Sequence, residues 1–234
     1  MIKKIISSLI PAHLLEKGLL YKFKYATLSF SQHGEDTILR DLLYKTKKGF
    51  YIDVGAHHPT RFSNTYWFYS NGWRGMNIDA SPLSMEVFKR IRPNDINIEI
   101  GISDKPTISN FYMFEKPAFN TFSKHLANTY QKQGFKILRI VKVKMDTLKN
   151  VLDNYFVPKQ EIDFMNIDVE GYDLEVLRSN DWNRYTPRVV VIEDNDFSIK
   201  DPYCSSIANF LKERDYKIIT YTGHTLFFIK QCYL

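Results

Sequence analysis

Short apolar runs alternate with amphipathic stretches along most of this chain. Five runs have the length and the β-branched or aromatic content typical of buried parallel strands: residues 50–54, 75–79, 96–100, 163–168 and 188–192. Helices are predicted before, between and after these runs, the first of them at 36–44, where apolar residues recur at helical spacing. The others are 64–69, which is dense in aromatic residues, 83–91, one starting at Asp146, one around 174–177, and 205–214. This alternation predicts an α/β fold with a mostly parallel sheet and right-handed crossovers.

Two regions depart from the alternation. Residues 216–221 and 225–229 predict a closing hairpin, joined by Thr222, Gly223 and His224. Residues 110–114 and 140–145 predict two extra strands around a polar and aromatic middle at 115–133. We interpret this middle as an excursion on the substrate side, with a plain loop as the alternative.

Residue types at two helix starts give local predictions. Asp146 is expected to cap the helix that follows it, and Pro82 is expected in the first turn of the helix at 83–91.

With 234 residues the chain can form one sizeable core. We predict an N-terminal helical extension at 1–30 and one domain at 31–234, with an insertion at about 105–145.

The first 20 residues resemble a signal peptide only superficially. Lys3 and Lys4 precede a short apolar part that Ser7 and Ser8 interrupt, and no small-residue cleavage site follows. The pattern predicts an amphipathic helix that packs on the domain edge, with contact to a membrane surface as the alternative. No run of 18 apolar residues is present, so no transmembrane helix is expected.

Charge and cysteine content narrow the class of protein. The net charge of +6 is a mild basic excess, compatible with an acidic glycan, a nucleotide sugar or a membrane surface. No nucleic acid partner is expected, because the cations form no recognisable binding motif. Cys204 and Cys232 form no CxxC pair and are expected as reduced thiols. The predicted location is the cytoplasm, with peripheral contact at the inner membrane as the alternative.

Chemistry-bearing residues follow the ends of the predicted strands. Gly55 comes directly after the first strand, where the lack of a β-carbon permits a sharp turn and a close approach of a ligand. Ligands in open α/β sheets bind at the carboxyl ends of the strands. Acidic residues occupy these ends: Asp53, Asp79, Asp168 with Glu170, and Glu193 with Asp194. Gln32 and Glu35, at the start of the first helix, are expected to reach over the same crevice, with a plain helix cap as the alternative.

These acids favour a cationic ligand over a dinucleotide. Asp79 follows Asp53 by about one βαβ repeat, which suits an acid that binds ribose hydroxyls. The turn at Gly55 lacks the GxGxxG pattern that holds a pyrophosphate. Like charges at ~5 Å, in an effective dielectric of about 20, cost on the order of 3 kcal/mol per pair. S-adenosylmethionine, with a ribose, an ammonium, a sulfonium and no phosphate, suits this crevice better.

Five strings in order identify a family resemblance: SQHGED, FYIDVGAHHP, SNTYWFYSNGWRGMNIDASP, IGISD and FMNIDVEGYDLEVL. Together they resemble the FkbM family of S-adenosylmethionine-dependent methyltransferases over about residues 31–194. The resemblance implies a class I methyltransferase, a Rossmann-like, mostly parallel sheet with helices on both faces. The closing hairpin is similar to the last two strands of that sheet.

The resemblance also implies O-methylation, with sugars and polyketides among the family's acceptors. By position, Gly55 faces the methionine part of the cofactor, Asp79 the ribose, and Ser103 with Asp104 the adenine. The full set of implied cofactor-binding residues is Gln32, Glu35, Asp53, Gly55, Asn64, Asp79, Ser81, Ser103, Asp104 and Asp168. His57-His58-Pro59 departs from the usual glycine-rich loop and is interpreted either as a variation of the cofactor loop or as a catalytic addition.

A sugar hydroxyl is a poor nucleophile, so a general base or a metal is expected. The candidate catalytic residues are Asp168, Glu170, His58 and Glu193. One alternative is that Glu170 only caps the helix at Tyr172. Another is that the acids form an all-oxygen site for Mg²⁺ or Ca²⁺, although the base alone is favoured. His224 is expected to be structural.

The predicted function is a SAM-dependent O-methyltransferase acting on a sugar hydroxyl of a surface glycan or its precursor. The acceptor is expected to be a carbohydrate or a nucleotide sugar. Three aromatic residues are expected to be exposed and to stack on the acceptor: Tyr112, Phe119 and Tyr130. Together with contacts from Lys116 and Lys124, they would suit an anionic or sugar-phosphate acceptor. The alternatives are a NAD-dependent oxidoreductase or epimerase on nucleotide sugars, and a non-catalytic glycan-binding module.

Overall fold

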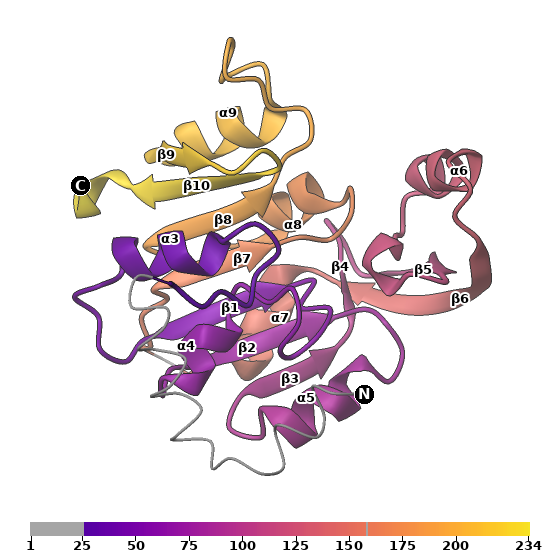
Figure 1. Ribbon diagram of the computed structural model, residues 1–234, viewed down its shortest axis with the longest axis horizontal. Helices are drawn as coiled ribbons and strands as arrows, with labels where there is room; N and C mark the ends of the chain where they lie inside the picture. The colour runs from indigo at the N-terminus through magenta and orange to yellow at the C-terminus, as the bar shows by residue number, and fades with distance from the viewer. Residues whose placement is uncertain (1–25, 158) are drawn as a thin grey trace.

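The computed structural model describes residues 26–157 and 159–234 (Figure 1). The predicted N-terminal helix lies outside the described residues. Within them, no helix is both long enough and apolar enough to span a lipid bilayer.

A seven-stranded sheet forms the centre of the molecule (Figure 1). Its strands are β1 (Phe50–Val54), β2 (Arg74–Asp79), β3 (Ile96–Glu99), β7 (Phe164–Ile167), β8 (Val189–Glu193), β9 (Tyr216–Tyr221) and β10 (Thr225–Lys230). The order is β3-β2-β1-β7-β8-β10-β9, and only β10 runs opposite to the rest. This arrangement confirms the predicted class I methyltransferase fold with its closing hairpin. A short 3-10 helix, Gln231–Tyr233, follows β10.

Helices cover both faces of this sheet. The helices α3 (Glu35–Leu42) and α4 (Tyr66–Ser70) pack on one face, and α5 (Ser84–Ile91) packs on β2 and β3 beside α4. The other face carries α7 (Leu148–Tyr155), α8 (Asp173–Ser179) and α9 (Ser206–Lys212). Successive side chains of β1 point to opposite faces, so Ile52 and Val54 join the core under α7–α9 while Tyr51 joins the core under α3 and α4.

A second, three-stranded sheet lies beside the main sheet, and it contains the two extra strands that the sequence predicted. Its strands are β4 (Gly101–Ile102), β5 (Thr107–Phe114) and β6 (Ile137–Asp146), in the order β4-β6-β5. The connection between β5 and β6 is not a plain loop, because it holds a 3-10 turn (Pro117–Phe119) and α6 (Lys124–Lys132). We call residues 105–146 the insert lobe; Figure 1 shows it to one side of the main sheet, with α6 at its far end.

The insert lobe has small cores of its own, and this overturns one prediction. Tyr112 is buried, and Phe119 and Tyr130 pack with Phe135 in the same cluster. These aromatic side chains were expected to be exposed and to stack on an acceptor. They turn inward instead, because a three-stranded sheet and one short helix are stable only if their apolar faces are covered.

Two local predictions at helix starts are also wrong. The cap of α7 is Thr147, whose hydroxyl accepts from the Asn150 amide, while the Asp146 carboxylate accepts from the Thr147 amide and the Asn150 side chain. Pro82 lies before α5, since Leu83 adopts a left-handed conformation (φ 68°) and the helix begins one residue later. Short-range preferences select the neighbourhood of a helix start but not the residue.

Gly55 makes the sharp turn that its residue type predicted, and the group that approaches it closely is the protein backbone. Its φ is +83°, and a β-carbon at this position would lie 1.8 Å from the Asp168 carbonyl oxygen. The turn after β1 therefore passes directly against the end of β7. Only glycine combines this φ with this distance.

Candidate active site

A cavity opens at the carboxyl ends of β1, β2 and β7, as expected for a ligand site in an open α/β sheet. Eight of the predicted site residues line it: Gln32, Asp53, Gly55, Asn64, Asp79, Ser81, Asp168 and Glu170. Five do not: Glu35, His58, Ser103, Asp104 and Glu193. The insert lobe supplies part of the wall through Phe111, Pro117 and Phe122.

Asp79 holds two backbone segments at the cavity. Its carboxylate accepts from the His57 amide at 2.8 Å and from the Ser81 amide at 2.7 Å, one bond on each oxygen. Each carboxylate oxygen keeps a free lone pair for a further donor. The prediction that Asp79 binds ribose hydroxyls stays a prediction, and the geometry is compatible with it.

A buried row of polar side chains crosses the sheet beneath this cavity. Asp53 lies in register with Asn77 on one side and Asn166 on the other. Asp53 is 2% exposed, and its carboxylate accepts from the Thr65 hydroxyl at 2.6 Å and from the side-chain amide of Asn166 at 2.9 Å. Burial raises the pKa of Asp53, while the bond from Thr65 opposes the shift. Asn166 in turn accepts from Asn64, so the row reaches the cavity wall.

Arg92 supplies the charge that this row needs. Its guanidinium is fully buried and donates to the Pro59 carbonyl, the Ser63 hydroxyl at 2.7 Å and the Thr65 hydroxyl at 2.8 Å. It also donates to Asn77. Thr65 thus links Arg92 to Asp53, and the loop after β1 is fixed along one wall of the cavity. Arg92 was not predicted as a site residue, because no pattern of nearby residues in the chain marks it.

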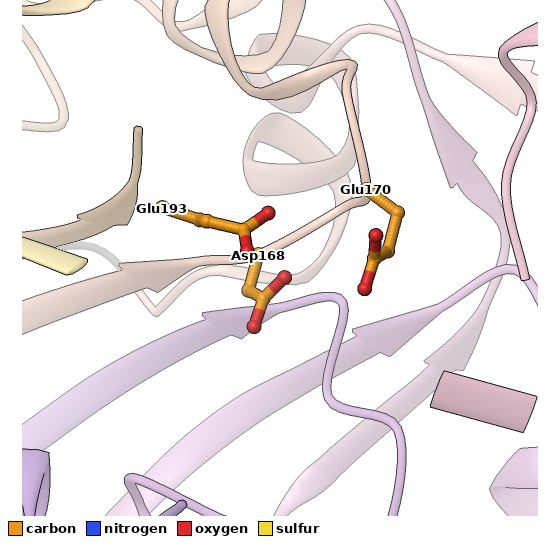
Figure 2. A group of neighbouring side chains, drawn as sticks. All are labelled: Asp168, Glu170 and Glu193. Atoms are coloured by element: carbon orange, nitrogen blue, oxygen red, sulfur yellow. The ribbon is translucent and has the colours of Figure 1, made fainter. Parts of the chain in front are cut away.

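Three carboxylates gather at the mouth of the cavity (Figure 2). Asp168 follows β7, Glu170 lies two residues further on, and Glu193 ends β8. Oxygens from the three side chains all lie within 4.8 Å of one another. Asp168 is exposed to solvent and the other two are half-buried.

This crowding raises the affinity of the cluster for protons. Burial, and then repulsion from Asp168, raises the pKa of Glu170 to about 8. Burial, and then repulsion from Glu170, raises the pKa of Glu193 to about 8. The pKa of Asp168 is also raised: although its side chain reaches solvent through the cavity, the protein around it removes part of its hydration, and the charge of Glu193 adds to the shift. Near neutral pH the cluster therefore retains protons, and once deprotonated these carboxylates are stronger bases than ordinary ones.

The insert lobe holds Glu170 in place. Glu170 has a left-handed backbone (φ 53°), its carbonyl accepts from the Thr121 hydroxyl at 2.7 Å, and its carboxylate accepts from the Tyr130 hydroxyl at 2.7 Å. Left-handed φ in a non-glycine residue costs free energy and needs surrounding contacts to persist. The alternative that Glu170 caps α8 is wrong, because Asp173 instead accepts the amides of Val169 and Gly171.

Two predicted site residues, Glu35 and His58, have structural partners away from the cavity. Glu35 accepts from the His33 amide at 2.8 Å and from the Thr222 hydroxyl at 3.2 Å, which ties the first helix to the closing hairpin. His58 Nδ1 accepts from the amides of Thr60 and Arg61, both at 3.1 Å, so it closes a tight turn. Burial lowers the pKa of His58 and favours this neutral form.

Ser103 and Asp104 also lie beyond the cavity. The Ser103 amide donates to the Asp146 carbonyl, and its hydroxyl donates to Asp104 at 3.2 Å. The residues that line the wall at this point are Gly101 and Ile102. That Ser103 and Asp104 contact an adenine remains a prediction that the geometry does not favour.

A second hollow adjoins the first and shares the carboxylate cluster through Glu193. Leu126, Leu174 and Ile207 give it apolar surface, and its acidic lining also includes Glu175 and Asp196. The sequence analysis did not single out Glu175, because it sits on a helix face where acids are common. The two cysteines, Cys204 and Cys232, are exposed free thiols.

Comparison with known families gives the assignment. The family model of the methyltransferase FkbM domain matches residues 53–218. The chain belongs to the FkbM methyltransferase family. The match spans the insert lobe, the carboxylate cluster and all of the cavity lining except Gln32 in this FkbM methyltransferase.

Similar solved structures are distant from this FkbM methyltransferase. A methyltransferase from Geobacter sulfurreducens is 11% identical, with 98% of this chain and 96% of that chain covered and a TM-score of 0.43. A precorrin-6y C5,15-methyltransferase from Geobacter metallireducens is 13% identical (88% and 95% covered, TM-score 0.46). An O-methyltransferase from Bacillus cereus in complex with SAH is 11% identical (97% and 96% covered, TM-score 0.41). A search of the curated proteins gives no match.

Proposed function

We propose that this protein transfers a methyl group from S-adenosylmethionine to a sugar hydroxyl of a surface glycan or its precursor. The observation that carries the proposal is the cluster of Asp168, Glu170 and Glu193 at the mouth of the cavity that Gly55 and Asp79 line. In a methyltransferase this is where a cationic donor and a weakly acidic acceptor would meet.

The charge of the cavity supports the donor. S-adenosylmethionine carries an ammonium and a sulfonium, and both are attracted by carboxylates in a partly dehydrated site. Its ribose hydroxyls can donate to the lone pairs that Asp79 keeps free. Gly55 lines the cavity where the turn after β1 passes the end of β7, and we propose that the methionine part lies beside this turn.

The chemistry needs alignment and one proton acceptor. The acceptor oxygen forms a bond to the methyl carbon as the carbon–sulfur bond breaks, and the electron pair of that bond stays on sulfur. The hydroxyl proton passes to a carboxylate, for which we propose Asp168 or Glu170. A carboxylate whose pKa is raised to about 8, as that of Glu170 is, is a much stronger base than an ordinary glutamate.

The second hollow is the proposed acceptor site. Gly171 in its lining directly follows Glu170 of the donor cavity, and the hollow combines apolar surface from Leu126 and Leu174 with acidic groups. Hydroxyl groups donate well to carboxylates, whereas a pyrophosphate would be repelled by them. We therefore favour a carbohydrate acceptor over a nucleotide sugar.

A divalent cation at the cluster remains the alternative to a base acting alone. Three carboxylates offer the hard oxygen ligands that Mg²⁺ and Ca²⁺ prefer. Acidic clusters are common without an ion, so we propose the base alone. Activity is expected to survive chelation by EDTA; a loss that Mg²⁺ restores would replace this proposal with metal assistance.

The direct test is calorimetry with S-adenosylhomocysteine. We expect binding to the wild type, at least tenfold weaker binding to Asp79→Ala because the ribose contacts are lost, and unchanged binding to the exposed-residue control Asp41→Ala. Mass spectrometry with isotopically labelled donor and a panel of sugars then identifies the acceptor. Absence of binding, or equal binding by Asp79→Ala, would contradict the proposed site.

A further inference from the structure

The positive charge of this chain is concentrated in the insert lobe. Residues 105–146 contain eight Lys and Arg residues and two Asp and Glu residues, a net charge of +6, which equals that of the whole chain. The remaining residues are therefore neutral in sum. All eight cations are exposed: Lys105, Lys116, Lys124, Lys132, Lys136, Arg139, Lys142 and Lys144. Within the described residues, none of them lies within 4.0 Å of a carboxylate oxygen of an acidic side chain.

Part of this charge shares a sheet face with exposed aliphatic side chains. The register of β5 and β6 places Ile108 opposite Lys144, Asn110 opposite Lys142, and Tyr112 opposite Ile140. Directly opposed residues of an antiparallel pair point to the same face. Ile108 is 66% exposed and Ile140 is 53% exposed. Leu138, 69% exposed, lies at the irregularity near the start of β6.

We propose that the insert lobe docks on an anionic lipid surface through β5 and β6. Lysines attract anionic headgroups over about a Debye length, and aliphatic side chains between them partition into the headgroup and acyl boundary. The surface offers both chemistries side by side. It is distinct from the acid-lined cavity, and the proposal does not depend on which acceptor the enzyme methylates.

Other anionic partners fit this surface less well. Single-stranded nucleic acids and glycans are held by stacking on exposed aromatic rings. The rings of this lobe, such as Phe114 and Tyr130, are packed inside it. A second copy of the chain would oppose Lys142 and Lys144 to themselves. An aliphatic and lysine-rich face with inward aromatic rings therefore matches a bilayer surface.

The lobe also contacts the candidate active site. Thr121 and Tyr130 donate to Glu170 from the lobe. A membrane-bound lobe would hold the carboxylate cluster next to the lipid surface without burying it. Methylation of a water-soluble acceptor should then be indifferent to docking.

The test is sedimentation of the full chain with vesicles. We expect binding to vesicles rich in phosphatidylglycerol, little binding to phosphatidylcholine vesicles, and weakening by salt. Lys142→Glu/Lys144→Glu should bind about tenfold or more weakly. The matched control Lys200→Glu/Lys217→Glu, with the same change of net charge at exposed positions outside the lobe, should bind as the wild type. Lys142→Gln/Lys144→Gln repeats the test with a smaller perturbation of β6.

Ile140→Asn separates a membrane from a soluble polyanion. It should weaken vesicle binding and leave binding to a soluble polyuronate unchanged. Failure to bind phosphatidylglycerol vesicles, binding that persists in both lysine double variants, or vesicle binding that ignores Ile140→Asn would each overturn the proposal. Unchanged S-adenosylhomocysteine affinity in every variant confirms that the cofactor site is intact.

Discussion

Single polar residues beneath the cavity do most to define its shape. Asp53, Asn77 and Asn166 occupy one register of three adjacent strands, where apolar residues would otherwise be expected. Buried polar groups are tolerated only when they are hydrogen-bonded, and here Arg92 and Thr65 complete the bonding. The polar row therefore supports the cavity wall, to which Asp53 and Asn166 themselves contribute.

Replacement of Arg92 should expose this dependence. Arg92→Met leaves the Pro59 carbonyl and the Ser63, Thr65 and Asn77 side chains short of a donor, so we expect a loss on the order of 3 kcal/mol in the free energy of unfolding by urea. Arg90→Met is the control, because Arg90 is exposed in the last turn of α5, just before Arg92, and it should change the free energy by less than about 0.5 kcal/mol. Similar losses in both variants would show that the buried bonds are unimportant.

Among the elements, the insert lobe is the one that acts on the chemistry from outside the main sheet. Its helix α6 and the turn before it reach the loop after β7 through Tyr130 and Thr121. Gly171, with φ +90°, lies against Leu126 of α6, where a β-carbon would be 2.5 Å from Leu126 Cδ1. The strained conformation of Glu170 is thus maintained by a segment about 40 residues earlier in the chain.

This contact predicts a change in pH dependence. The bond from the Tyr130 hydroxyl lowers the pKa of Glu170, which burial and Asp168 raise to about 8. If Glu170 is the base, kcat/KM rises as the pH increases through about 8, since the base must lose its proton. In Tyr130→Phe the rise should move to higher pH, and in Tyr112→Phe, a buried tyrosine of the same lobe, it should not. An unshifted profile in Tyr130→Phe would remove Glu170 from the role of base.

Charge is distributed unevenly over the whole molecule. Cations are concentrated in the insert lobe, whereas three carboxylates are forced together at the edge of the main sheet. A separation of this kind lets one protein attract an anionic surface at one place and a cationic cofactor at another. It also places a destabilising cluster of acids in the ligand-free protein.

The pH dependence of stability should report this cluster. The pKa of Glu193 is raised to about 8 in the folded protein, above its value in the unfolded chain. The resulting stabilisation is fully present below the unfolded pKa and is lost as the pH rises through about 8. We expect the Tm of the free wild type to fall between pH 6 and pH 9, and to fall less in Glu193→Gln. Glu213→Gln, on an exposed side chain, is the control; parallel curves for all three proteins would contradict the raised pKa.

The local pattern of residues was sufficient for the architecture. The strands, the closing hairpin, the turn at Gly55 and the acids at the strand ends follow from periodicity and residue type, which act within a few positions of the chain. Errors fell where neighbouring residues compete for one local role, as Asp146 and Thr147 do at the start of α7. The family strings added the methyltransferase assignment, which periodicity does not contain.

Tertiary structure determines which hydrogen bonds each acidic residue forms and which acidic residues retain a proton. The carboxylates of three of them accept hydrogen bonds from side chains far away in the sequence. These pairs are Asp53 with Asn166, Glu35 with Thr222, and Glu170 with Tyr130. Protonation and partners depend on burial and on neighbours brought together by folding, and no local pattern encodes either of them. For the same reason, evenly spaced lysines and isoleucines became a single charged and apolar face only when β5 and β6 paired.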